Sequence, residues 1–267
     1  MIRYYDGHVH YNHRLLDDDR KDILAKDYQQ GVIKALNCAS TMNSNFFMRK
    51  DLSPYVNKGT FIIKPPDFHV IRPKGPEIKF AIGKDPLFVG GDILSGKAFQ
   101  EERELIALAD FPDVKAVKTG LNYTFGTENA SYQKHWFQCL VHLALAYNLP
   151  LNLNVCNAWE DALHLLQTAF ECKQYKGVIL DWSQDADIAK RFMDMGFLLG
   201  IGSKVFYNLD VRETVKQYPL EMMVLESDFP RSNKKLPEIA QEVAALKNIP
   251  LEKVAEITFM NGEHLYG

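Results

Sequence analysis

The chain has 267 residues, 46% of them hydrophobic, and a formal net charge of −3 with no block of like charge. This composition supports a large folded core, gives no sign of intrinsic disorder, and argues against a broad nucleic-acid-binding face. No apolar run approaches the ~20 residues of a membrane span. No signal peptide is evident and the four cysteines have no C-x-x-C spacing, so we predict a cytoplasmic protein with no membrane partner.

Short apolar segments alternate with longer amphipathic ones along most of the chain. After a first strand within residues 1–10, the pattern predicts strands at 32–38, 80–83, 114–121, 150–155, 177–180, 197–202 and 222–228. Helices are predicted between them, at 14–30, 100–109, 132–147, 157–170, 185–195 and 211–217, and again from 235 onward. Apolar strands that alternate with helices form a parallel sheet, and about eight such units favour a barrel. We therefore predict an α/β fold with a single (β/α)8 TIM-barrel-like domain over 1–267.

Residues 41–78 do not fit this alternation. Five prolines interrupt the periodicity there, and the apolar piece 61–63 reads either as a strand or as part of an insertion. This stretch is predicted to be irregular and is a candidate insertion.

The first strand carries two histidines, His8 and His10, at positions i and i+2. Residues so spaced on a strand point to the same face, so both rings could reach one metal ion. In a (β/α)8 barrel the chemistry lies at the carboxyl ends of the strands. The polar residues predicted at those ends are His8, His10, Lys118, Asn154, Asp181 and Asp228.

Read in order, the chain resembles the TatD family of metal-dependent nucleases, within the amidohydrolase-like barrels. Residues 6–10 match that family's D-x-H-x-H, and residues 225–230 (LESDFP) correspond to its L-E-T-D-A-P. Residues 133–150, 197–207 and 249–258 are similar to further family segments, so the resemblance spans nearly the whole chain and is loosest between 41 and 78.

The resemblance implies a site of two metals, and this chain keeps about half of it. One ion would be bound by the histidine pair and the last-strand aspartate, which fall on His8, His10 and Asp228. The second ion would need two more histidines and a bridging glutamate. Those positions hold Lys118 for the glutamate, and Asn154 and Leu180 for the histidines. The family's G-x-H-P is also altered, since it reads Gly83-Lys84-Asp85-Pro86 here.

Lys118 is the most consequential of these replacements, because an ammonium repels a metal ion. It could be carbamylated and bridge metals, or it could stay a cation that holds a substrate phosphate or carboxylate, which we favour. An ion pair with Asp181 or Asp228 is the purely structural alternative. Asp181 directly follows the lost histidine and would need a bulge to face the site.

We predict a TatD-like metal-dependent hydrolase that acts on phosphodiester bonds through one divalent ion, which would be Zn²⁺, Mg²⁺ or Mn²⁺. In this prediction Asp228 and Lys118 are catalytic, and Asn154, Asp181 and Lys118 bind a small-molecule or nucleic-acid-end substrate. The alternatives are a catalytically silent relative that binds protein partners, and a mononuclear amidohydrolase that acts on a C–N bond. We predict packing roles for Trp182 and Phe229, and surface or packing roles for the other histidines, His135 among them.

Overall fold

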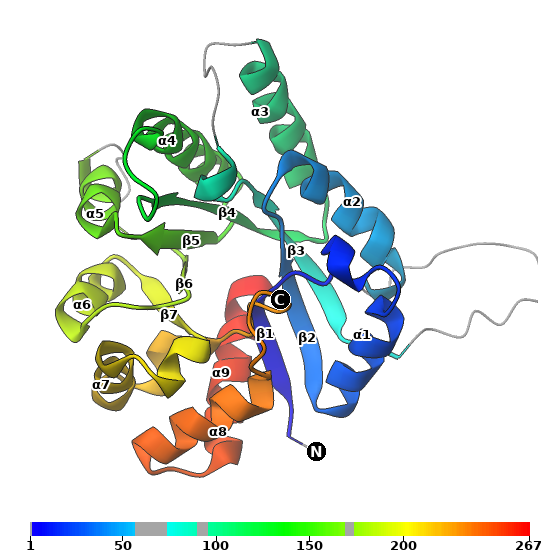
Figure 1. Ribbon diagram of the computed structural model, residues 1–267, viewed down its shortest axis with the longest axis vertical. Coiled ribbons are helices and arrows are strands. Elements are labelled where there is room, and N and C mark those ends of the chain that lie inside the picture. Colours follow the sequence, from blue (N-terminus) through cyan, green and yellow to red (C-terminus); the bar gives the residue numbers. More distant parts are fainter. Residues whose placement is uncertain (1, 57–73, 90–95, 169–173) are drawn as a thin grey trace, which may run out of the picture.

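Eight parallel strands form one sheet in the order β1 to β8, with helices around its outside (Figure 1). The computed structural model describes residues 2–56, 74–89, 96–168 and 174–267. The strands are β1 (Tyr4–Val9), β2 (Val32–Cys38), β3 (Glu77–Gly83), β4 (Val114–Asn122), β5 (Leu151–Cys156), β6 (Gly177–Leu180), β7 (Phe197–Ile201) and β8 (Met223–Leu225). The predicted (β/α)8 barrel is therefore confirmed.

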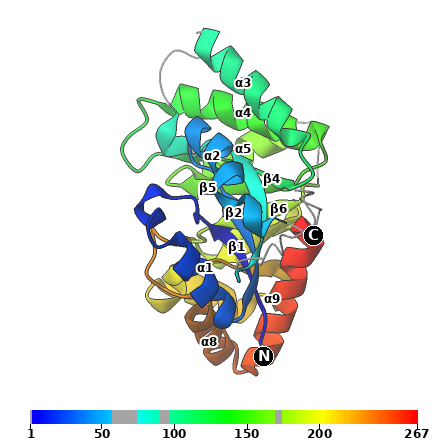
Figure 2. The ribbon, with the colours of Figure 1, turned by 90° about the vertical axis from the view of Figure 1, so that its right-hand side faces the viewer.

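Except for α2, the main helices follow the predicted segments closely. They are α1 (Arg20–Gln29), α2 (Met42–Leu52), α3 (Gly96–Ala109), α4 (Ala130–Ala146), α5 (Trp159–Thr168), α6 (Ala186–Asp194), α7 (Leu209–Gln217), α8 (Leu236–Lys247) and α9 (Leu251–Tyr266). Figure 2 shows α3 and α4 together at one end of the molecule and α8 at the other. Within the described part of the chain, no helix is both long and apolar enough to cross a membrane.

The stretch 41–78 is more regular than predicted in its first part, because it contains α2 and the short 3-10 helix η2 (Ser53–Tyr55). Thr41 and Ser44 form a reciprocal cap at the start of α2, in which each side chain accepts a hydrogen bond from the backbone N–H of the other. A serine in place of the usual glutamate conceals this signal in the sequence. The apolar piece 61–63 lies outside the described residues.

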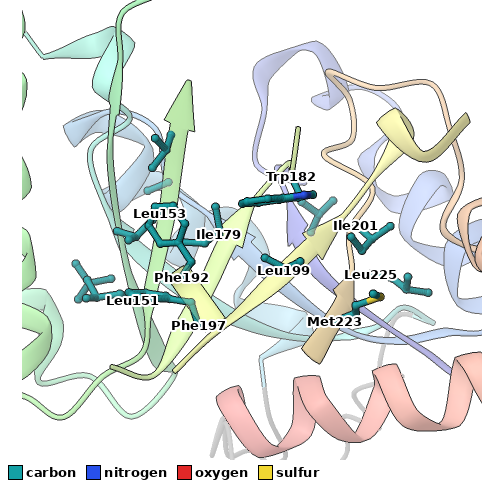
Figure 3. Packing of buried hydrophobic residues seen from close by; sticks show 14 of the residues in the cluster. Leu151, Leu153, Ile179, Trp182, Phe192, Phe197, Leu199, Ile201, Met223 and Leu225 are labelled. Atoms are coloured by element: carbon teal, nitrogen blue, oxygen red, sulfur yellow. The ribbon is translucent and has the colours of Figure 1, made fainter. Parts of the chain in front are cut away.

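Strand residues alternate between the two faces of the sheet. Outward residues such as Leu151, Leu153, Phe197 and Leu199 pack with the helices in the larger hydrophobic cluster, part of which is drawn in Figure 3. A smaller cluster uses the alternate strand positions and includes Val178 from β6. This alternation places the inward side chains of successive strands close together at the carboxyl ends.

The sheet closes where its last strand approaches its first. Asp6 on β1 accepts hydrogen bonds from the backbone N–H of Ser227 at 3.0 Å and from its Oγ at 2.6 Å. The backbone N–H of Asp228 donates to the carbonyl of His8 at 2.9 Å. These bonds fix the segment after β8 against the end of β1, which carries the two histidines.

Candidate metal centre

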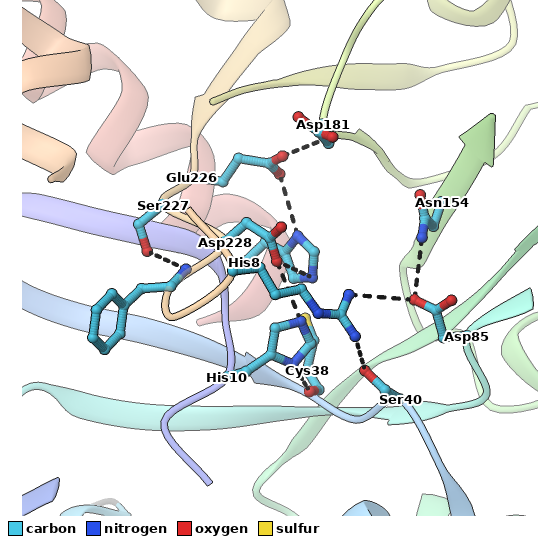
Figure 4. A network of polar contacts seen from close by, with 12 residues as sticks. His8, His10, Cys38, Ser40, Asp85, Asn154, Asp181, Glu226, Ser227 and Asp228 are labelled. Atoms are coloured by element: carbon cyan, nitrogen blue, oxygen red, sulfur yellow. Dashed lines mark hydrogen bonds and ion pairs between the residues drawn. The ribbon is translucent and has the colours of Figure 1, made fainter. Parts of the chain in front are cut away.

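His8, His10 and Asp228 meet where β8 approaches β1, at the carboxyl ends of these strands, as Figure 4 shows. His8 lies on β1, and His10 is the first residue after that strand. Asp228 lies beyond β8 in a left-handed backbone conformation, with φ of 50°. The backbone N–H of His10 donates to the carbonyl of Phe229 at 2.8 Å, which holds the two segments together. The histidine pair and an aspartate some 220 positions later in the sequence thus lie together at the carboxyl ends of the barrel strands.

The donor atoms of the three side chains converge. Asp228 Oδ1 lies 3.4 Å from His10 Nε2 and 3.8 Å from His8 Nε2. Tetrahedral ligands at zinc–nitrogen and zinc–oxygen distances lie about 3.4 Å apart, so the observed separations suit one ion. These three atoms are buried and have no hydrogen-bond partner within the described residues. Buried polar atoms are normally satisfied, and a metal ion would satisfy all three at once.

The imidazoles are held in the form that a metal requires. His10 Nδ1 lies 2.6 Å from the carbonyl of Cys38, which fixes the ring and leaves Nε2 directed toward Asp228. Burial lowers the pKa of both His8 and His10, so that both rings are neutral at pH 7. For Asp228, burial opposes ionisation, but the adjacent His10 and His8 rings and the positive charge of Arg231 together hold its pKa well below the usual range. Two neutral imidazoles and a carboxylate are a suitable ligand set for zinc and similar ions.

Lys118 forms an ion pair with neither Asp181 nor Asp228, the two carboxylates of the structural alternative. Its Nζ lies 3.1 Å from Asp85 Oδ2, and both side chains are almost completely buried, at 0% and 1% exposure. Burial would raise the pKa of Asp85, but Lys118 and Arg231 outweigh that effect and hold it well below its ordinary value. A carbamate on Lys118 would bring two anions together here, so the pair disfavours carbamylation. Nor does a fully buried Lys118 present its ammonium for direct contact with a substrate.

Asn154 and Asp181 lie around the same strand ends but have partners of their own. Asn154 Nδ2 donates to Asp85 Oδ2 at 3.1 Å, so Asp85 contacts both Asn154 and Lys118, two of the positions where the resemblance implies ligands of a second metal. Asp181 turns inward through a left-handed φ of 50° rather than a bulge, and its carboxylate lies 2.7 Å from Lys204 Nζ. Leu180, where the family has a histidine, is buried in the smaller hydrophobic cluster.

Glu226 is a site residue that the sequence reasoning missed. It is fully buried, accepts a hydrogen bond from the backbone N–H of Asp181, and places Oε2 4.0 Å from His8 Nδ1. Burial raises its pKa well above the ordinary value, and the carboxylates of Asp181 and Asp228 add to that rise. The signal was present, because Glu226 is the glutamate of the L-E-S-D motif.

A cavity of about 530 Å³ opens beside the centre and is bordered by Asp228, Glu226 and Asp181. Three cations, Lys204, Arg231 and Lys234, also line it, together with the exposed ring of Tyr207. Arg231 is held in place by Ser40 Oγ, 3.0 Å from Nη2, and by Asp85 Oδ2, 3.6 Å from Nη1. The sequence pattern identified none of these cations as site residues, since they lie in loops beyond the strand ends.

The aromatic residues near the strand ends mostly serve packing. Trp182 is completely buried and meets Trp159 edge to face, with ring centroids 5.4 Å apart, as predicted. Phe229 packs partly buried against the larger cluster, and Lys235 Nζ lies 4.2 Å above its ring. His135 is not a simple surface histidine, because its Nε2 lies 3.2 Å from Glu102 Oε1 on a neighbouring helix.

An eight-stranded α/β barrel with a buried imidazole–carboxylate cluster at the carboxyl ends of its strands has the architecture of the barrel hydrolases that use a metal. The chain belongs to the TatD-related DNase family, whose model matches residues 5–267. The resemblance seen in the sequence is thus confirmed.

Several relatives align over nearly the whole chain. A metal-dependent hydrolase of Buchnera aphidicola is 25% identical over 98% of both chains. The human deoxyribonuclease TATDN3 is 23% identical over 98% of this chain and 93% of the relative. Among solved structures, the TatD homologue YJJV of Escherichia coli K12 superposes with a TM-score of 0.78 at 20% identity, covering 99% of this chain and 98% of that one. This structural likeness extends the family's barrel fold to this chain.

Proposed function

We propose that this protein is a metal-dependent hydrolase that cleaves a phosphodiester bond with one divalent ion held by His8, His10 and Asp228. The observation that carries the proposal is the convergence of three buried donor atoms that have no hydrogen-bond partner among the described residues. The names of the relatives, a metal-dependent hydrolase and a deoxyribonuclease, point to the same chemistry.

A single ion suits these residues better than two. The place of a second ion is taken by Lys118, Asp85 and Asn154, which satisfy one another through contacts of 3.1 Å. Lys118 contributes there the positive charge that a second metal would otherwise bring. We therefore assign Lys118 to the internal support of the site rather than to direct substrate contact.

When bound, a divalent ion supplies Lewis-acid activation of a water molecule and of the phosphoryl group. Asp228 borders the cavity and can accept the proton of the attacking water. Arg231 and Lys204 lie on the same cavity wall, where they can bind the phosphate oxygens and stabilise the charge that develops on them. The exposed ring of Tyr207 offers a surface for a base, which favours the end of a single-stranded nucleic acid as substrate.

Metal content tests the first half of this proposal. Elemental analysis of purified, metal-reconstituted protein should give about one equivalent more in the wild type than in Asp228→Asn. A difference of less than a tenth of an equivalent between the two proteins would rule out the metal-dependent mechanism. It would favour instead the alternative of a catalytically silent protein that binds partner proteins.

Activity tests the second half. A chromogenic phosphodiester and a short single-stranded DNA are assayed with added Mg²⁺, Mn²⁺ or Zn²⁺. Arg231→Ala should lower kcat/KM by about 10- to 100-fold, the value of one hydrogen bond to a charged group. Lys190→Ala, on the exposed face of α6 and paired with Asp194, is the matched control and should leave kcat/KM unchanged. Turnover that is unaffected by Asp228→Asn would contradict the proposal, and hydrolysis of amides but not diesters would favour the C–N alternative.

A further inference from the structure

A second group of ligand-type side chains lies away from the barrel mouth, between α3 and α4. His135 and Cys139 are four residues apart on α4, so they lie one turn apart on the same face of that helix. Glu102 reaches them from α3. These three residues and the barrel cluster are the two groups of His, Cys and acidic residues found in the described part of the chain that could hold a metal.

The three donor atoms of this group lie very close together. Glu102 Oε1 is 3.2 Å from His135 Nε2 and 3.3 Å from Cys139 Sγ, and Sγ is 3.6 Å from Nε2. Zinc bonds of about 2.0–2.1 Å to nitrogen and oxygen and about 2.3 Å to sulfur place tetrahedral ligands about 3.4–3.6 Å apart. The observed triangle needs adjustments of only a few tenths of an ångström to hold such an ion.

The arrangement does not fit a nucleophilic triad. In a triad the histidine uses one ring nitrogen for the nucleophile and the other for the carboxylate. Here the same nitrogen, Nε2, faces both Cys139 and Glu102. Three donor atoms that share one point are instead the geometry of metal coordination.

The group is accessible from solvent and leaves room for a further ligand. The side chains of Glu102 and His135 are 31% and 32% exposed, so an ion can enter without unfolding of the helices. A cavity of about 390 Å³ adjoins Glu102 and Cys139, and its remaining wall includes Leu105, Leu140 and Leu143. A water molecule or a small external ligand could occupy a fourth coordination position from this side.

We propose that Glu102, His135 and Cys139 form a second metal site, specific for zinc-like ions, that joins α3 to α4. A mixed nitrogen, oxygen and sulfur ligand set selects zinc, cobalt or copper over Mg²⁺ and Ca²⁺, which prefer oxygen alone. Because its ligands come from two helices, an ion at this place would tie the outer helix α3 to the helix beneath it. This site is independent of the barrel centre, whose ligands contain no sulfur.

Cobalt(II) substitution tests the site, because a thiolate ligand gives a charge-transfer absorption band in the near ultraviolet that nitrogen and oxygen ligands do not give. We expect the band in Co²⁺-loaded wild type and in Asp228→Asn, and its loss in Cys139→Ser. Cys156→Ser, a change of another cysteine that is only partly buried, is the matched control and should keep the band. Persistence of the band in Asp228→Asn would separate this site from the proposed hydrolytic one.

Two further variants test the other ligands. Glu102→Gln and His135→Asn should each weaken Co²⁺ binding by more than about tenfold, since even changes next to metal ligands cost about that much. Circular dichroism should show that the variants remain folded. A wild type without the band, or a band that survives in folded Cys139→Ser, would overturn the assignment.

Discussion

The buried pair of Lys118 and Asp85 gives a quantitative prediction. At 3.1 Å and an effective dielectric constant of about 20, two unit charges attract by about 5 kcal/mol. Loss of one partner from a buried pair costs about 3–5 kcal/mol, because the other charge is left uncompensated. Asp85→Asn keeps an acceptor for the backbone N–H of Leu87 but removes the charge, so it should lower the free energy of unfolding by at least about 3 kcal/mol.

The opposite change should cost less. In Lys118→Met, Asp85 still accepts hydrogen bonds from Leu87 and from Asn154 and keeps Arg231 nearby, so we expect a loss of about 1–2 kcal/mol. The double variant should resemble Lys118→Met, which gives a coupling energy of at least about 3 kcal/mol.

Urea unfolding, followed by fluorescence and circular dichroism together, measures these differences. With an m value near 3 kcal/mol/M, Asp85→Asn should shift the midpoint by about 1 M. Lys190 and Asp194 form a matched surface pair, with side chains 63% and 62% exposed, and should couple by less than about 0.5 kcal/mol. A coupling below about 1 kcal/mol for Lys118 and Asp85 would refute the view that this pair neutralises itself inside the barrel.

Three further predictions concern the same region. The stability difference between wild type and Asp85→Asn should stay constant from pH 8 to about 5 and shrink only below about pH 4. Folding lowers the pKa of Asp85, so its carboxylate stabilises the fold at pH values above the unfolded pKa, and this stabilisation is lost as the pH falls. Urea unfolding at each pH measures the difference. Removal of the metal by a chelator should lower Tm by about 5–10 °C when the metal had been present at about 100 times its Kd, and a smaller chelator effect in loaded Asp228→Asn than in wild type would assign the difference to the barrel site. Gly200→Ala places a Cβ against Glu226 and 3.0 Å from the carbonyl of Ile179, so thermal unfolding should show a stability loss of about 1–3 kcal/mol. In the control Gly96→Ala, the new Cβ meets no atom within 4 Å, so stability should not fall. Equal Tm values for these two variants would contradict the close packing of Glu226.

The sequence predicted the barrel well, because its evidence is periodic. Apolar strands and amphipathic helices repeat along the chain, and small errors at their ends do not change the order of the sheet. The helix α2 was missed because Phe46 and Phe47 are half exposed and weaken its amphipathic pattern. The prolines after α2 also hid the short helix η2 from the periodicity.

Sequence reasoning brought site residues together only where a motif and a strand end indicated the same role. His8, His10 and Asp228 were brought together by motif and position, and the structure places them in contact. Asp85 was not among the partners considered for Lys118, because charge alone does not say which carboxylate is near. Asp85 precedes Lys118 by 33 positions and comes from the end of the neighbouring strand, a relation fixed by the register of β3 and β4.

Closure of the barrel has a consequence for how tightly its ends are held. Ladder pairing joins each strand to the next from β1 to β8, whereas the junction of β8 with β1 relies on a few hydrogen bonds near Asp6. Both histidines lie on one side of that junction and Asp228 lies on the other. An ion bound between them would link the two sides of the junction and stabilise the closed barrel. Its removal should therefore speed amide hydrogen exchange at this junction more than elsewhere in the sheet.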